Sequence, residues 1–302
     1  MAKNIKIDDA TKKQRDKRNI IHTVLSVLVI IVMFRQFFMG NYSNVFTCLL
    51  TIVLFTIPTV ADRTLNIKLP IVLEALIMFF IFSAEILGEI QSFYTIIPFW
   101  DTLLHTINGF MMAAIGFAMI DILNQSPNFH MNLSPIFVAF IAFCFSMTIG
   151  VIWEFFEYLM DQFFLTDMQK DWLMKDVSSV LLNPSGLNDP IVIRDVTKTV
   201  ITGTIDGVEQ DWVINGAYLD VGIVDTMKDM IVNCVGAVVF SIFGFFYISN
   251  RGKGRVVSSF IPKLKTKEEI RETEEMLKAR KEENEKKHEA KINRKRLKRN
   301  SK

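Results

Sequence analysis

Residues 222–249 read GIVDTMKDMIVNCVGAVVFSIFGFFYIS, and two patterns overlap in them. The later part, Ile231–Ile248, is an apolar run without a charged residue, close to the ~20 helical residues that cross about 30 Å of hydrocarbon. The earlier part carries Asp225, Asp229 and Asn233 at intervals of four residues, which places them on one face of a helix. The sequence therefore predicts a membrane-spanning helix that begins with acidic side chains.

Further apolar runs of similar length precede this one. They are Ile20–Phe34, Val45–Ala61, Leu69–Leu87, Leu103–Ile120 and Ile136–Ile152. Such runs exclude a soluble globular protein. The three cysteines each stand alone in an apolar run, so a disulfide-linked scaffold is excluded as well. We expect an all-α, polytopic transmembrane bundle whose six helices lie at about 19–39, 44–61, 69–90, 99–122, 134–161 and 222–249.

Charge divides the chain into three parts. Residues 1–18 have a net charge of +4, residues 19–250 of −12 and residues 251–302 of +10. Lys and Arg concentrate in the cytoplasmic segments of membrane proteins, and an even number of spans returns the chain to the side on which it began. Both termini are therefore expected in the cytoplasm.

Residues 162–221 form the one long connection and are expected outside the membrane. Asp206-Gly207 is a strong hairpin signal, so we expect a hairpin of Thr197–Ile205 and Val208–Ile214, preceded by a short helix near Asp171–Leu182. The predicted order is a basic cytoplasmic N-terminus (1–18), helices one to five (19–161), an external insertion with a small α/β-hairpin fold (162–221), helix six (222–249) and a charged, helical cytoplasmic tail (250–302).

Ionisable residues gather where four of the predicted helices meet the outer side. They are Asp101 and His105, Glu154, Glu157 and Asp161, Asp225 and Asp229, and Glu85 and Glu89. The helix dipole favours anions at helix N-termini, which accounts for Asp101, Asp225 and Asp229 taken singly. It does not account for the glutamates and Asp161, because those lie at helix C-termini. A shared function of the group is the remaining explanation.

Several carboxylates in a low dielectric must hold protons, pair with cations or bind metal. Arg35 and Lys228 are the only cations expected at this level, too few to neutralise the group. A divalent metal ion with His105 as its nitrogen ligand is the economical solution, and a proton relay is the main alternative. The predicted metal ligands are His105, Asp101, Glu154, Glu157, Asp161, Asp225 and Asp229. The predicted catalytic residues are Asp101, His105, Glu154, Glu157, Asp225 and Asp229.

Small residues interrupt the apolar faces of three of these helices. Glycine permits close approach of neighbouring helices in a membrane. We therefore expect Gly109, Gly116, Gly150 and Gly236 to serve helix packing rather than the site.

Three motifs carry a resemblance to known families. They are Asp101-x-x-Leu104-His105-x-x-x-Gly109, Glu154-x-x-Glu157-Tyr158 and Asp225-Thr226-x-x-Asp229-x-x-x-Asn233-x-x-Gly236. Their order resembles that of the VanZ-like and, more closely, the YjdF-like families of bacterial multi-pass membrane proteins. The resemblance implies a helical bundle in the bacterial cytoplasmic membrane and implies no particular chemistry.

Three functions remain open at this point. The first is an integral membrane protein whose outward-facing cluster binds a divalent cation and acts on, or recognises, a lipid-linked or phosphate-bearing headgroup. As an enzyme it would be a metal-dependent hydrolase or transferase. The second is a cation- or proton-coupled transporter, and the third is a structural or stress-related membrane component. The lipid bilayer is the expected partner. No nucleotide fingerprint occurs, and no nucleic-acid partner is expected.

Overall fold

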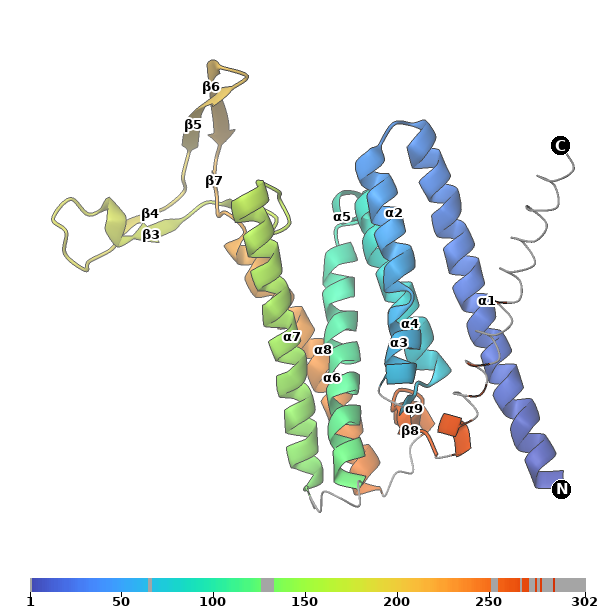
Figure 1. Ribbon diagram of the computed structural model, residues 1–302. Helices are drawn as coiled ribbons and strands as arrows, with labels where there is room; N and C mark the ends of the chain where they lie inside the picture. Colours follow the sequence, from blue (N-terminus) through green and yellow to red (C-terminus); the bar gives the residue numbers. More distant parts are fainter. Residues whose placement is uncertain are drawn as a thin grey trace, which may run out of the picture. The chain divides into compact units, whose positions relative to one another are not determined.

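The computed structural model describes residues 2–64, 67–125, 133–250, 255–266, 268–271, 275, 278 and 285 (Figure 1). Its long helices are α1 (Ala2–Phe38), α2 (Tyr42–Leu54), α3 (Ile57–Thr64), α4 (Ile71–Ile81), α6 (Trp100–Gln125), α7 (Pro135–Phe164) and α8 (Ile223–Ser249). A π-helix, η1 (Phe82–Ile90), continues α4, and the short helices are α5 (Phe93–Ile96) and α9 (Arg255–Ser258).

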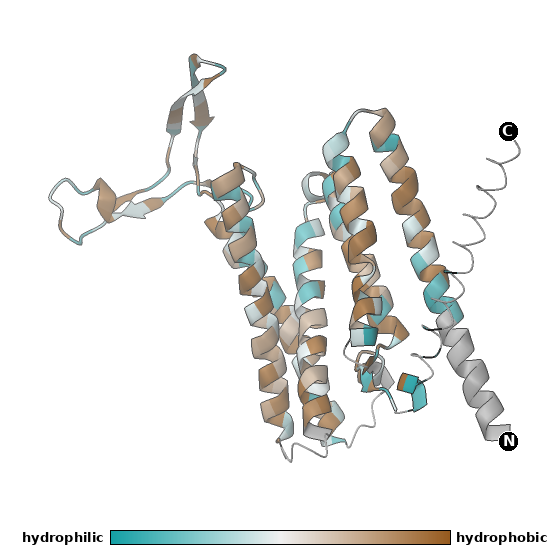
Figure 2. Ribbon diagram, in the orientation of Figure 1, coloured by the Kyte–Doolittle hydropathy of each residue, from teal (hydrophilic) through white to brown (hydrophobic). Residues whose placement is uncertain are grey.

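Six helical segments are long and apolar enough to cross a membrane. They are Asp16–Phe38, Tyr42–Thr64, Ile71–Ile90, Trp100–Leu123, Pro135–Phe164 and Ile223–Ser249. The predicted helical bundle with six spans is confirmed, and each end falls within three residues of the prediction. Figure 2 shows that hydrophobic residues predominate along these helices, as expected of helices that face lipid. Pairs of opposite charge four residues apart favour the predicted helix of the tail, namely Glu274/Lys278, Glu282/Lys286 and Glu283/Lys287. They lie outside the described residues, apart from Lys278.

The chain forms two compact units. The first comprises residues 1–91, 118–132 and 250–302, and the second comprises 92–117 and 133–249. Within the first unit, α1 packs against α2 and α4 around a core of buried apolar side chains. That core consists of Leu25, Val29, Cys48, Phe55, Met78 and Ile86.

The start of the tail is attached to the loop that follows α3. Strand β1 (Ile67–Lys68) pairs antiparallel with β8 (Lys263–Leu264). The Nζ of Lys265 lies 2.9 Å from a carboxylate oxygen of Asp62, and the Nζ of Lys68 lies 3.2 Å from the carboxylate of Glu269. These contacts bring two of the basic segments of the first unit to one place.

In the second unit, glycines set the spacing of α6, α7 and α8. A Cβ on Gly109 of α6 would overlap the backbone carbonyl of Asn233 on α8, and one on Gly236 would overlap the backbone carbonyl of Thr106. A Cβ on Gly150 of α7 would lie 2.8 Å from the side-chain nitrogen of Asn233. The predicted packing role is therefore confirmed for these glycines, and the backbones of α6 and α8 lie in direct contact.

Local signals explain where α7 and α8 begin. Ser134 precedes α7 in an extended conformation, and its hydroxyl accepts a hydrogen bond from the Phe137 N–H, with Pro135 in the first turn. At the other end of the insertion, the Asp220 carboxylate accepts a hydrogen bond of 2.8 Å from the Val224 N–H in the first turn of α8. Both starts use a polar side chain to satisfy an N–H that the helix leaves free.

The insertion between α7 and α8 is built from antiparallel strand pairs. Its strands are β2 (Leu173–Met174), β3 (Val177–Ser179), β4 (Ile191–Ile193), β5 (Lys198–Ile205), β6 (Val208–Asn215) and β7 (Tyr218–Leu219), with a 3₁₀ turn η2 (Val180–Leu182) after β3. Strand β2 pairs with β7, β3 with β4, and β5 with β6.

The predicted hairpin is confirmed as β5 and β6, joined by Asp206 and Gly207. Both turn residues have positive φ, 51° and 78°, as a type I′ turn requires. The predicted helix near Asp171–Leu182 is wrong, because Leu173–Met174 and Val177–Ser179 pair as strands β2 and β3 and only Val180–Leu182 form a 3₁₀ turn. Each of those strands finds its partner at the far end of the insertion or across a long loop, and this tertiary pairing overrides the local preference.

Candidate functional site

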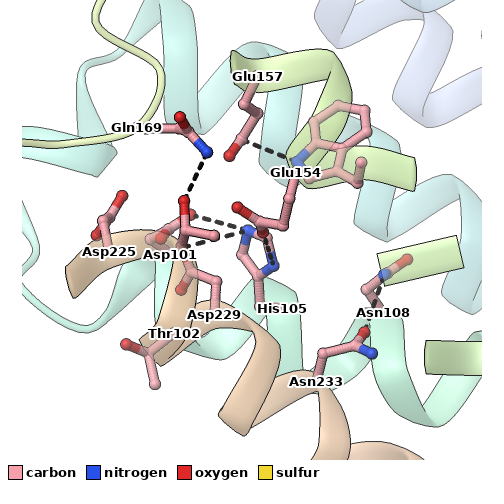
Figure 3. Close-up of polar contacts among 12 residues, drawn as sticks. Asp101, Thr102, His105, Asn108, Glu154, Glu157, Gln169, Asp225, Asp229 and Asn233 are labelled. Carbon is pink, nitrogen blue, oxygen red and sulfur yellow. Dashed lines mark hydrogen bonds and ion pairs between the residues drawn. The ribbon is translucent and has the colours of Figure 1, made fainter. Parts of the chain in front are cut away.

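Three side chains of α6 and α8 converge where the insertion joins the helices (Figure 3). Asp101 and His105 lie one turn apart on α6, and Asp229 faces them from α8. The Nε2 of His105 is 3.5 Å from the Asp101 carboxylate and 3.9 Å from the Asp229 carboxylate. One oxygen or nitrogen from each residue lies within 4.8 Å of the other two, so this triad of Asp101, His105 and Asp229 could hold a metal ion.

The close contact of the two backbones produces this convergence. Gly109 lies four residues beyond His105 on α6, and it touches the backbone of Asn233, which lies four residues beyond Asp229 on α8. Residues four apart lie on one helix face, so His105 and Asp229 stand one turn from the point of contact.

The second nitrogen of His105 faces α7. Its Nδ1 lies 4.0 Å from a carboxylate oxygen of Glu154. Glu157, one turn further along α7, accepts a hydrogen bond of 2.8 Å from the indole nitrogen of Trp153. The imidazole therefore stands between two Asp on one side and one Glu on the other, as Figure 3 shows.

Two of the carboxylates near His105, those of Asp229 and Glu154, are buried in the part of the chain that the structure describes. Asp229 is 2% exposed and Glu154 5% exposed. One oxygen of each, Oδ1 of Asp229 and Oε2 of Glu154, makes no hydrogen bond to any described residue. No Lys or Arg among those residues forms an ion pair with them. Buried anionic oxygens of this kind are costly unless a cation or a proton satisfies them.

The one cation that the sequence offers on α8 points elsewhere. The Nζ of Lys228 lies 5.0 Å from the centre of the Trp172 ring, in a cation–π contact with the insertion. Lys228 thus helps to hold the loop between α7 and β2 against α8, and its ammonium is engaged there.

Other predicted ligands are bonded to this same loop. The Asp161 carboxylate accepts hydrogen bonds of 2.7 Å from the Met168 N–H and 2.8 Å from the Gln169 N–H. The Asp225 carboxylate accepts one of 2.9 Å from the Lys170 N–H and one of 3.5 Å from the indole nitrogen of Trp172. Together with Asp220, they form the group that we term the loop-bound carboxylates: Asp161, Asp220 and Asp225. The inclusion of Asp161 and Asp225 among the metal ligands stays a prediction.

Asp220 is the member of that group that sequence reasoning missed. Its carboxylate accepts hydrogen bonds from the Trp172 N–H at 2.6 Å and from the Val224 N–H at 2.8 Å, so it joins both ends of the insertion. The available signal was its position just before the apolar run of α8, where Asp commonly caps a helix. Gln169 was also missed; its side-chain amide donates a hydrogen bond of 2.5 Å to the Thr226 hydroxyl.

Below the triad, a neutral polar network joins the three helices. The Asn108 side-chain amide donates to the Asn233 side-chain oxygen at 3.2 Å, and the Ser146 hydroxyl donates to the Gly109 carbonyl at 2.8 Å. Asn233 in turn donates to the Ser146 carbonyl at 3.5 Å. These bonds fix the rotation of α6 and α8, on which the positions of His105 and Asp229 depend.

In the loop between α7 and β2, outside the membrane-spanning segments, the ionised form of one carboxyl is disfavoured. Partial burial, together with the neighbouring carboxylates of Asp167 and Asp220, raises the pKa of Asp171 above its ordinary value. The negative charge of the neighbouring carboxylates therefore disfavours ionisation of Asp171. Glu85 and Glu89 lie in η1, in the first unit, and their part in the site stays a prediction.

Comparison with known proteins gives a family and no closer relative. No curated protein matches the chain, and no solved structure matches it. The resemblance to the YjdF-like and VanZ-like families thus stays a prediction. Residues 20–250 match the family described as "Predicted membrane protein (DUF2238)", whose members are predicted to lie in the membrane. Since this match covers more than half of the chain, the protein belongs to the DUF2238 family of predicted membrane proteins.

Proposed function

We propose that this membrane protein binds a divalent cation through the triad and uses it to recognise, or to act on, a phosphate-bearing or lipid-linked headgroup. The observation that carries the proposal is the convergence of three ligand atoms within 4.8 Å, one of them on a carboxylate that is 2% exposed. A second observation supports it, since Oδ1 of Asp229 has no hydrogen-bond donor among the described residues. One nitrogen with several oxygens suits Mn²⁺, Mg²⁺, Fe²⁺ or Zn²⁺.

Glu154 has a distinct part in this proposal. A metal-bound histidine usually donates its other N–H to a carboxylate, which fixes the ring and its tautomer. Glu154 lies on the Nδ1 side of His105, opposite the two Asp that face Nε2. We therefore assign Nε2 to the metal and Glu154 to positioning the ring.

The ligand set in this proposal is narrower than the set that the sequence suggests. Glu157, Asp161 and Asp225 all accept hydrogen bonds from nearby N–H groups. These donors stabilise the three carboxylates without a metal ion. In this proposal their role is structural: Glu157 accepts the hydrogen bond of Trp153, and Asp161 and Asp225 hold the loop that lies next to the triad.

The proposal also places the triad on the outer side of a bacterial cytoplasmic membrane, with both termini inside. The basic ends of the chain support this orientation. The pairing of β1 with β8 supports it further, because it brings the basic loop after α3 and the start of the basic tail to the same place. The order of the three motifs supports kinship with the YjdF-like proteins.

A cation at this place would suit a headgroup more than a species that crosses the membrane. The triad lies in the first two turns of α6 and α8, at the end of the membrane-spanning segments, where phosphates of lipids reside. A protein-bound divalent ion binds phosphate oxygens and can activate a water molecule. Asp101 is the most exposed member of the triad, with 33% of its side chain accessible, so a headgroup would meet it first.

The test is a comparison of metal content and turnover in wild type, His105→Ala and His22→Ala. The protein is purified in detergent, loaded with Mn²⁺, freed of excess ion and measured by elemental analysis. We expect about one Mn²⁺ per chain in wild type and in His22→Ala, whose imidazole lies in α1, and none in His105→Ala. Release of inorganic phosphate from farnesyl diphosphate, a soluble lipid-like diphosphate, should depend on Mn²⁺ and on His105.

Two results would contradict the proposal. Equal metal content in all three proteins would exclude the site. The protein could also bind the metal but neither bind nor hydrolyse the diphosphate. If it then took up Mn²⁺ into proteoliposomes in a His105-dependent way, the function would be transport and not headgroup recognition.

A further inference from the structure

The β3–β4 hairpin, which we term the arm (residues 177–193), differs in chemistry from the rest of the insertion. It contains a single charged residue, Asp189, and no Lys or Arg. The neighbouring β5–β6 hairpin carries four charged residues, Lys198, Asp206, Glu209 and Asp211. The two hairpins of the insertion therefore differ in charge.

The arm exposes large aliphatic side chains at its far end. Leu181 in the turn η2 is 93% exposed and Leu187 is 67% exposed. Val180 and Leu182 are also exposed, as are all three residues of β4. Figure 2 shows the turn η2 in brown, whereas the loop that joins it to β4 is largely hydrophilic. An apolar surface of this kind on a small two-stranded element marks a contact with another apolar phase.

The base of the arm is fixed to the rest of the insertion. The Val196 N–H donates to the Lys175 carbonyl at 2.8 Å, and the Asp195 N–H donates to the Asp176 carboxylate at 3.0 Å. The Tyr218 hydroxyl, on β7, donates to the Asp176 carbonyl at 3.1 Å. The arm thus has a defined direction relative to the strands that join α7 and α8.

The arm leaves the helix pair near the end of α7. In Figure 1 the arm extends sideways from the helix pair at the level of the last turns of α7, whereas β5 and β6 extend beyond the end of α7. The last residues of α7 and its cap are themselves apolar and exposed, with Phe163, Phe164 and Leu165 at 75%, 70% and 90%. The arm and the exposed apolar end of α7 therefore lie at one level of the second unit.

We propose that the arm lies in the interface of the surrounding lipid leaflet, with Leu181 and Leu187 inserted beside the acyl chains. Interfacial elements bury their apolar side chains about 5–10 Å into the boundary between headgroups and acyl chains. Because the arm has no basic residue, its insertion depends on apolar contact and not on anionic lipid. The proposal is independent of metal binding by the triad.

The experiment places a fluorescent reporter on the arm. In a chain whose Cys48, Cys144 and Cys234 are replaced by Ser, Leu181→Cys and Leu187→Cys provide two reporter sites, and Glu209→Cys on β6 provides the matched control. Each protein is labelled with a nitrobenzoxadiazole dye and reconstituted in vesicles of phosphatidylcholine. Lipid brominated near the headgroup end of its acyl chains reports contact with lipid, and aqueous iodide reports contact with water.

We expect brominated lipid to quench the dye at 181 and 187 and iodide to leave it bright, with the opposite result at 209. Adding anionic lipid should change neither result. Quenching by iodide at 181 and 187 equal to that at 209 would overturn the proposal. Shielding from iodide without quenching by brominated lipid would also overturn it, since it would mean that a second copy of the chain covers the arm.

Discussion

Two groups of acidic side chains lie at the same end of α6, α7 and α8, and they are satisfied in opposite ways. The loop-bound carboxylates accept hydrogen bonds from N–H groups of the insertion and of α8. Asp229 of the triad and Glu154 beside it are more deeply buried than a solvated carboxylate can be, and each retains an oxygen without a donor. The proposed ligand set therefore depends on the lack of a hydrogen-bond donor and not on acidity alone.

Asparagine substitutions at Asp229 and Asp225 should separate the two groups most strongly. Asp229→Asn removes a charge from the triad, so we expect a loss of Mn²⁺ affinity greater than the about 10–100-fold that removal of a supporting residue costs. Asp225→Asn should retain Mn²⁺ binding, because the carboxylate of Asp225 accepts its hydrogen bonds from N–H groups of the loop. Calorimetric titration measures both, and an equal loss in the two variants would refute the distinction.

Glu154→Gln tests whether the carboxylate on the Nδ1 side of His105 strengthens metal binding by the imidazole. We expect an affinity for Mn²⁺ that is lower by about 10–100-fold, with unchanged stoichiometry, because the amide cannot take up charge from the ring. Glu157→Gln is the control, since its oxygen is held by Trp153. The assignment fails if the two glutamine variants bind Mn²⁺ alike.

Gly109→Ala tests the backbone contact on which the triad depends. A Cβ there overlaps the Asn233 carbonyl, so the helices must separate, at a cost of about 1–3 kcal/mol. We expect a lower unfolding temperature and weaker Mn²⁺ binding. Gly203→Ala in β5, where a Cβ would meet no atom within 4 Å, should leave both unchanged.

Asp220→Ala weakens the loop-bound group without touching the triad. It leaves the Trp172 and Val224 N–H groups without their acceptor, and loss of such a cap costs about 1 kcal/mol. We expect faster proteolysis within residues 162–221 and unchanged Mn²⁺ affinity. Asp211→Ala on the exposed β6 strand serves as the control, and weaker Mn²⁺ binding in Asp220→Ala would show that the two groups are coupled.

The smallest effect on stability is expected at Asp171, where substitution should stabilise the protein instead of destabilising it. Its raised pKa means that folding disfavours its ionised form, so its contribution to stability falls as pH rises through the carboxyl titration. Asp171→Asn should therefore unfold at a slightly higher temperature than wild type at pH 7. Below about pH 3.9, the ordinary pKa of Asp, the two proteins should unfold alike. Thermal unfolding followed by circular dichroism measures the difference.

The spans and the hairpin were predictable because their signals are local. An apolar run such as Ile231–Ile248 and a turn such as Asp206-Gly207 carry their structure in adjacent residues. The strands β2 and β3 were not predictable in this way, because their partners are remote in sequence. Pairing over such distances leaves little mark on a single sequence.

The candidate site likewise contains features that a local pattern predicts and features that depend on remote parts of the chain. Spacing of four residues places Asp101 with His105 on one helix face, and the structure confirms that they face each other. The donors that occupy Asp161 and Asp225 come from backbone N–H groups of Met168, Gln169 and Lys170. Every residue except proline carries a backbone N–H donor, so the residue type does not indicate which N–H will bind a carboxylate.

X-ray absorption at the manganese edge of the loaded protein tests metal binding by the triad most directly. The proposal predicts one bound Mn²⁺ with a shell of oxygen ligands and the multiple scattering of a single imidazole, and it predicts that this imidazole signature disappears in His105→Ala. A spectrum without imidazole scattering in wild type, or one that is the same in His105→Ala, would contradict the triad as the metal site.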